Sequence, residues 1–88
     1  MELVNYMEEV VARVFDELTQ SPPYLEVSFS EKMKMDICAY ALNHLPPRYV
    51  VTDKGHLYTR VNELKQQFQT DVVVELTKAI ERVQANPR

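Results

Sequence analysis

Two proline pairs, Pro22-Pro23 and Pro46-Pro47, set the main limit on how this chain of 88 residues can fold. Proline has no backbone N–H to donate, and its ring clashes with the preceding helical turn, so each pair is expected to end a helix. The chain has a single glycine, which leaves little material for the tight turns of a β-sandwich or barrel. We therefore expect one domain, residues 1–88, with helices in the segments that the prolines separate.

The first two segments carry apolar residues at helical spacing. Residues 2–19 predict a helix that ends before Pro22, with apolar positions at Leu3, Met7, Val10, Val11, Val14, Phe15 and Leu18. Residues 24–29 alternate in polarity and predict a loop or a short edge strand. Ser30 is a suitable N-cap for a second helix over residues 31–45. Both flanks of this helix are apolar, which predicts that it is the most buried one.

The third segment begins with β-like residues. Residues 48–52 and 56–59 predict two short extended pieces around Gly55, the residue best suited to a turn with positive φ. A last helix is expected over residues 61–85, and its apolar stripe is typical of a coiled-coil seam: Val61, Leu64, Phe68, Val72, Leu76, Ala79 or Ile80, and Val83. Such a helix spans about 37 Å, so part of the stripe is expected to meet a partner chain. Asp71 interrupts the stripe.

The predicted fold is mainly α, a small three-to-four-helix domain with a short extended or hairpin segment after the Pro46-Pro47 turn. A domain of this size buries only roughly 60% of the surface that its unfolded chain exposes. Its own core then gives modest stability, and a second copy would add to it. We therefore expect a homodimer.

Charge and targeting signals limit the partners. Thirteen acidic residues against ten Lys and Arg give a net charge of −3, so direct DNA binding is not expected. No run of about 18 apolar residues is present, which predicts no membrane span. Glu2, Glu8 and Glu9 stand where a signal peptide would be basic. These features predict a cytoplasmic protein.

Few residues could carry catalysis. His44 and His56 are the only histidines, and no cysteine or carboxylate stands at metal-ligand spacing with them, which favours surface positions. Cys38 lies between Ile37 and Ala39 on a helix that we expect to be buried, which favours a small core residue over a nucleophile. We therefore expect no enzymatic activity, no cofactor and no metal.

Four polar residues share one face of the second predicted helix, at spacings i, i+4, i+8 and i+11. They are Lys32, Asp36, Tyr40 and Asn43. One interpretation is structural: Lys32 and Asp36 form an ion pair, and Asn43 caps the helix. The other is that these side chains, with Arg48 and Tyr49 after the proline turn, supply the charged, amide and aromatic groups that hold a nucleotide. The spacing alone leaves both interpretations open.

The most distinctive stretch of the chain is residues 36–50, which read D-I-C-A-Y-A-L-N-H-L-P-P-R-Y-V. This stretch closely resembles the signature D-I-x-A-x-A-L-N-x-L-P-P-x-Y-V of the late competence development protein ComFB family. The opening residues 5–11 and the closing residues 86–88 are also similar to that family. The resemblance therefore covers nearly the whole chain.

The resemblance implies a small, mainly helical, homodimeric bacterial protein. It also implies a receptor for a cyclic dinucleotide second messenger, cyclic di-GMP or cyclic di-AMP, that acts on a downstream protein in competence or motility control. Some members carry a zinc-binding C-x-C-x-x-C cluster before the motif aspartate, where this chain has Ser28, Ser30 and Met33. Hydroxyl and thioether groups are poor zinc ligands beside thiolates, so no structural zinc is expected.

Residue type and motif position suggest roles in a ligand site. Arg48 could bind a phosphate or the O6 and N7 atoms of guanine, and Tyr49 or Tyr40 could stack on a base. Asp36 could accept from guanine N–H groups, and Asn43 could contact a base edge. Lys32 adds positive charge to this region. The alternative function is a dimeric protein-interaction module without a nucleotide ligand.

Overall fold

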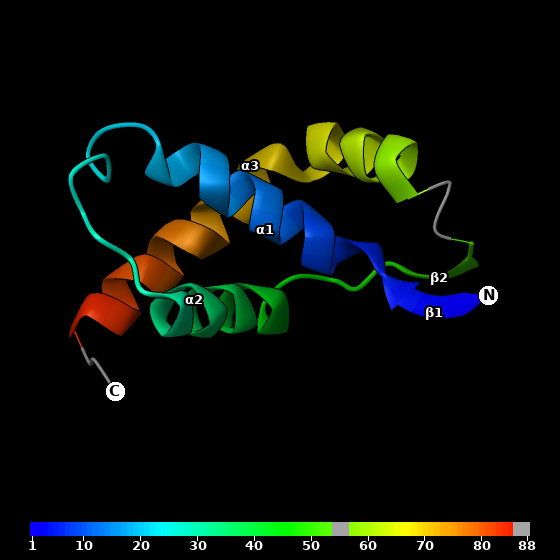
Figure 1. The fold of residues 1–88 in the computed structure, drawn as a ribbon, viewed down its shortest axis with the longest axis horizontal. Helices are drawn as coiled ribbons and strands as arrows, with labels where there is room; N and C mark the ends of the chain where they lie inside the picture. Colours follow the sequence, from blue (N-terminus) through cyan, green and yellow to red (C-terminus); the bar gives the residue numbers. More distant parts are fainter. Residues whose placement is uncertain (54–56, 86–88) are drawn as a thin grey trace.

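The computed structural model describes residues 1–53 and 57–85, which form three helices and one two-stranded antiparallel sheet. In chain order the elements are β1 (Glu2–Asn5), α1 (Tyr6–Thr19), α2 (Glu31–Asn43), β2 (Tyr49–Thr52) and α3 (Leu57–Ala85). Figure 1 shows the sheet at one end of the molecule and the C-terminal half of α3 beside α2 at the other. The mainly helical prediction is confirmed, and the sheet contains the expected extended segment.

Strand β1 corrects the predicted first helix. The sequence predicts a helix from residue 2, but α1 begins at Tyr6, and the residues before it pair with β2. Leu3 fits helical spacing ahead of Met7, yet it lies opposite Val51 in the sheet and is 71% exposed. A local pattern cannot reveal this pairing, because two complete segments of the chain separate β1 from β2.

Asn5 marks the boundary between β1 and α1. Its Oδ1 atom accepts a hydrogen bond from the backbone N–H of Met7 at 3.1 Å and so caps the helix. The negative charges of Glu8 and Glu9 in the first turn interact favourably with the helix dipole and stabilise this end of α1. The helix then buries a continuous apolar face, made of Tyr6, Met7, Val10, Val11, Val14 and Phe15. It ends before the first proline pair, as predicted.

Helix α2 begins where the sequence predicts, but it is not the most buried helix. The Oγ atom of Ser30 accepts from the backbone N–H of Met33 at 3.1 Å, which confirms the N-cap. The helix ends at Asn43, two residues before the predicted end, and buries only Ile37 and Ala41. Met35 is 65% exposed. The helices α1 and α3 pack against one side of α2, so its second apolar flank faces outward.

Residues 24–29 form a loop, which was one of the two predicted structures. The ring of Phe29 packs edge-to-face against Phe15 of α1, with centroids 5.5 Å apart. The ring of Tyr24 also packs edge-to-face against Phe29, with centroids 6.4 Å apart. The loop therefore folds back over the end of the core.

The predicted hairpin around Gly55 is wrong in its pairing. Strand β2 confirms the first extended piece, but its partner is β1, and the second piece is helical from Leu57. Gly55 and His56 lie outside the described residues. Backbone hydrogen bonding between these two segments continues past the strands, because the N–H of Tyr6 donates to the carbonyl oxygen of Arg48 at 2.9 Å. This additional bond favours the β1–β2 pairing.

The apolar stripe of α3 is buried within its own chain, at Val61, Leu64, Val72, Leu76, Ala79 and Ile80. Helix α1 covers the first half, where Lys65 pairs with Glu17 at 2.6 Å, and α2 covers the second half, where Arg82 lies 5.8 Å from the ring of Tyr40. Two shorter helices of the same chain thus cover most of the stripe. Phe68 and Val83 are only partly buried, so contact of part of the stripe with a partner chain stays a prediction. Asp71 is exposed and lies off the stripe.

Candidate functional site

Arg48 connects the second proline pair to the sheet. Its backbone N–H donates to Oδ1 of Asn5 at 2.8 Å, and its carbonyl oxygen accepts from Tyr6. The residue is exposed, and its guanidinium carbon lies 4.9 Å from the ring centroid of Phe68 on α3. No carboxylate among the described residues forms an ion pair with it. Arg48 is thus a positioned cation whose charge is not neutralised.

Tyr49 lies next to Arg48 at the start of β2 and is 63% exposed. Residues two apart on a strand point to the same face, so Tyr49 shares its face with Val51, which pairs with Leu3. All three side chains are mostly exposed. We call Leu3, Tyr49 and Val51 the outer sheet face. Val4 and Val50 lie on the inner face, against the helical core.

The four candidate residues of α2 make contacts within the chain. Lys32 Nζ lies 3.4 Å from Oδ2 of Asp36, so the structural interpretation of that pair is confirmed. The Tyr40 ring stacks on His44 at 4.4 Å and faces Arg82 of α3. The C-cap position is His44, whose Nδ1–H donates to the carbonyl oxygen of Tyr40 at 2.7 Å. Asn43 is exposed and is the last helical residue, so it is not the predicted cap.

The structure therefore divides the six candidates. Arg48 and Tyr49 are exposed neighbours at the start of β2, whereas Lys32 and Asp36 neutralise each other on α2. Lys34, the other lysine of this region, pairs with Asp16 at 3.0 Å. Of the basic side chains near the proline turn, Arg48 alone keeps a charge without an ion pair among the described residues.

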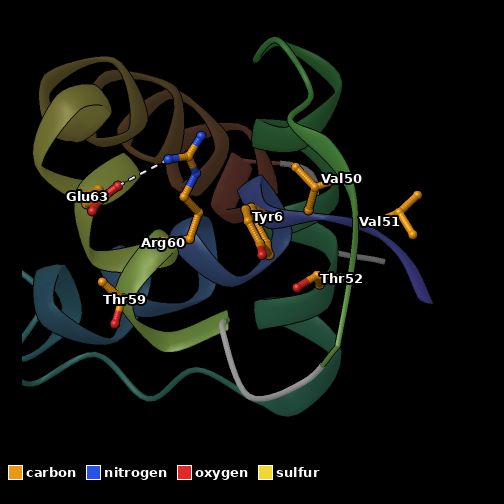
Figure 2. A pocket seen from close by; sticks show the side chains of 7 residues that line it. All are labelled: Tyr6, Val50, Val51, Thr52, Thr59, Arg60 and Glu63. Atoms are coloured by element: carbon orange, nitrogen blue, oxygen red, sulfur yellow. Dashed lines mark hydrogen bonds and ion pairs between the residues drawn. The ribbon is translucent and has the colours of Figure 1, made fainter. Parts of the chain in front are cut away.

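Sequence patterns missed a pocket of about 320 Å³ between β2 and the start of α3. Figure 2 shows its lining: Tyr6, Val50, Val51, Thr52, Thr59, Arg60 and Glu63. None of the six candidate residues lines this pocket. Its β2 residues directly follow Arg48 and Tyr49 in the chain. One sequence signal was available, because Arg60 lies in the first turn of α3, where a cation opposes the helix dipole.

Comparisons with known proteins add to this geometry. The sequence model of the late competence development protein ComFB family matches residues 4–87. The chain belongs to the ComFB family. A solved structure of the late competence protein ComFB from Bacillus subtilis is similar to it, with 26% identity and a TM-score of 0.77, over 99% of this chain and 93% of that one. No curated protein matches the chain significantly. The family places this chain among competence-related proteins.

The positions that correspond to the zinc cluster of some ComFB proteins have other contacts here. Ser30 caps α2 by bonding to Met33, and both belong to the start of that helix. Within residues 1–53 and 57–85, no three His, Cys, Asp or Glu side chains gather as a metal site would require. No described helix is long and apolar enough to cross a membrane.

Cys38 of this ComFB protein is half-buried on α2. Burial raises the pKa of its thiol, and the nearby Lys34 opposes this effect only in part. A raised pKa lowers the fraction of thiolate, which is the reactive form. The environment thus agrees with a packing role rather than a nucleophile.

Proposed function

We propose that this ComFB-family protein is a receptor for a cyclic dinucleotide second messenger, cyclic di-GMP or cyclic di-AMP. The observation that carries the proposal is the exposed Arg48 guanidinium, which is held on Phe68 without a neutralising carboxylate among the described residues. Arginine binds phosphate through two parallel N–H groups, and packing on a ring orients its plane. A ligand phosphate would supply the counter-charge.

Tyr49 supplies a second group that such a ligand requires. Its exposed ring directly follows Arg48, so a cation and a flat stacking surface lie side by side at the start of β2. Stacking of a base on an aromatic side chain contributes about 1–3 kcal/mol. Because Lys32, Asp36 and Tyr40 already have partners within the chain, the proposal rests on Arg48 and Tyr49.

We propose further that the receptor is a homodimer that pairs through the outer sheet face. A two-stranded sheet is marginal alone, and three exposed apolar or aromatic side chains on it favour coverage by another surface. A cyclic dinucleotide with two identical halves is two-fold symmetric, and a two-fold dimer presents identical half-sites to such a ligand. This symmetry selects a second copy of the chain as the occupant.

Thermal unfolding tests the proposed function. A ligand that binds only the folded state adds RT ln(1 + [L]/Kd) to stability, or about 2.7 kcal/mol at a concentration of 100 Kd. We expect the Tm to rise with the concentration of at least one of the two dinucleotides. Linear di-nucleotides of the same bases serve as controls. A Tm that neither cyclic ligand changes would favour an interaction module that acts on a partner protein without a nucleotide.

A further inference from the structure

The outer edge of β1 has no neighbouring strand. Among the described residues the sheet contains only β1 and β2, and it lies at one end of the molecule (Figure 1). Each strand therefore has one edge that faces away from the other. An open edge can accept a further strand, because its backbone N–H and C=O groups lack partners.

The register of the sheet shows which backbone groups of β1 face this edge. Tyr6 lies opposite Arg48 and donates its N–H to the Arg48 carbonyl oxygen, so these two residues form a hydrogen-bonded pair. Along an antiparallel ladder, hydrogen-bonded pairs alternate with non-hydrogen-bonded pairs. The N–H groups of Leu3 and Asn5, and the Leu3 carbonyl oxygen, therefore point away from β2. None of these groups has a hydrogen-bond partner among the described residues.

A groove of about 310 Å³ follows the same edge. Its lining residues are Leu3, Val4, Asn5, Tyr6, Glu8 and Glu9. Successive residues of a strand point to opposite faces of a sheet, so a groove that touches Leu3, Val4 and Asn5 in turn follows the edge rather than one face. All of the lining belongs to β1 and the first turn of α1, so no other described element covers this edge.

The charge of the groove indicates what would bind there. Glu9 pairs with Arg13 at 3.2 Å, but Glu8 is exposed and forms no ion pair with a described residue. Among the described residues, no lysine or arginine lines the groove, so the negative charge of Glu8 remains. A second β1 would bring no basic side chain to match it. A strand with basic side chains would complement this charge.

We propose that the β1 edge binds an extended, basic segment of a partner protein, which adds to the sheet as a third strand. The backbone of the segment bonds to Leu3 and Asn5, as in other cases of strand addition. Its side chains alternate, with apolar ones beside Leu3 and basic ones near Glu8. This docking mode does not require a nucleotide ligand, because the edge lies on the side of β1 away from Arg48.

Fluorescence anisotropy of the intact protein with a labelled peptide of alternating lysine and valine tests the proposal. We expect saturable binding that weakens at high salt, and no binding of the matching peptide of glutamate and valine. Glu8→Gln should weaken binding of the lysine peptide about threefold. Glu81→Gln, at an exposed position on α3, is the matched control and should leave it unchanged. No binding of the lysine peptide, or equal affinities for Glu8→Gln and wild type, would overturn the proposal.

Amide hydrogen exchange measured by NMR tests the strand addition itself. In the free protein the N–H groups of Leu3 and Asn5 should exchange rapidly, and that of Val4, which faces β2, more slowly. Saturation with the lysine peptide should slow exchange at Leu3 and Asn5 by about tenfold or more. Binding without this protection would overturn strand addition. Slow exchange at Leu3 in the free protein would also overturn it, because a second copy of the chain would then already pair with this edge.

Discussion

The side chain of Asn5 holds the backbone of Arg48, which lies 43 residues later in the chain. One oxygen atom, Oδ1, accepts from the N–H of Arg48 at 2.8 Å and from the N–H of Met7 at 3.1 Å. The same side chain therefore caps α1 and fixes the start of β2. The capping of α1 and the position of Arg48, the residue proposed to bind phosphate, thus both depend on the side-chain amide of Asn5.

Replacement of Asn5 by alanine should destabilise the fold more than loss of an ordinary cap. We expect the free energy of unfolding to fall by about 2 kcal/mol, because both the cap and a long-range hydrogen bond are lost. Ser30→Ala removes a cap with one bond and should cost about 1 kcal/mol. Urea denaturation measures both variants. Equal losses would mean that the bond to Arg48 contributes nothing.

Leu3 tests the proposed dimer surface. Leu3→Glu places a charge on the outer sheet face and should convert the dimer to a monomer without unfolding it, because Leu3 is exposed in the single chain. Light scattering of the purified protein gives the mass directly. Met35→Glu, at a similarly exposed position on α2, is the control and should stay dimeric. A dimer in both variants would place the interface elsewhere.

Lys34 and Asp16 predict a dependence of stability on alkaline pH. The hydrogen bond to Asp16 raises the pKa of Lys34 above its ordinary value of 10.5, against the opposing effect of burial. A group with a raised folded pKa contributes its full stabilisation below the unfolded pKa and loses it as pH rises through the folded one. The contribution is small, since Asp16 is more than half exposed.

Asp16→Asn should therefore destabilise the protein at about pH 9 by a fraction of a kcal/mol and have no effect at about pH 12. Denaturant titrations of both proteins at the two pH values measure the difference. Asp71→Asn, which changes an exposed carboxylate on α3, provides the control. A difference that persists undiminished at the higher pH would show that the pair is not its source.

Local sequence patterns predicted most of the helical core. They did not predict the contacts between segments that are distant in the chain. Ser30 specified the start of α2 through a short-range hydrogen bond, and the proline pairs limited through sterics how far α1 and α2 could extend. The pairing of Leu3 with Val51 depends on a distant strand, and the apolar spacing of Leu3 favoured a helix instead. The pocket has the same origin, because Tyr6 and Glu63 meet only after α3 has packed against α1. The i, i+4 spacing along one helix pointed to Lys32 and Asp36 as candidate site residues, but in the structure these two side chains form an ion pair with each other.

Arg48→Ala should weaken the binding of both dinucleotides by about tenfold or more, because their phosphates are identical. The Tm should fall only slightly, since the Arg48 side chain that contacts Phe68 is itself exposed. Lys78→Ala removes an exposed cation from α3 and should leave both affinities unchanged. Equal affinities for wild type and Arg48→Ala would remove Arg48 from the site.

The most direct test of the central claim is a calorimetric titration of the wild-type protein with cyclic di-GMP and cyclic di-AMP, at a protein concentration checked for dimer by light scattering. A receptor of the proposed kind should give saturable heat with at least one of them, at one ligand for each pair of chains. No heat with either ligand at roughly tens of micromolar would contradict the proposed function.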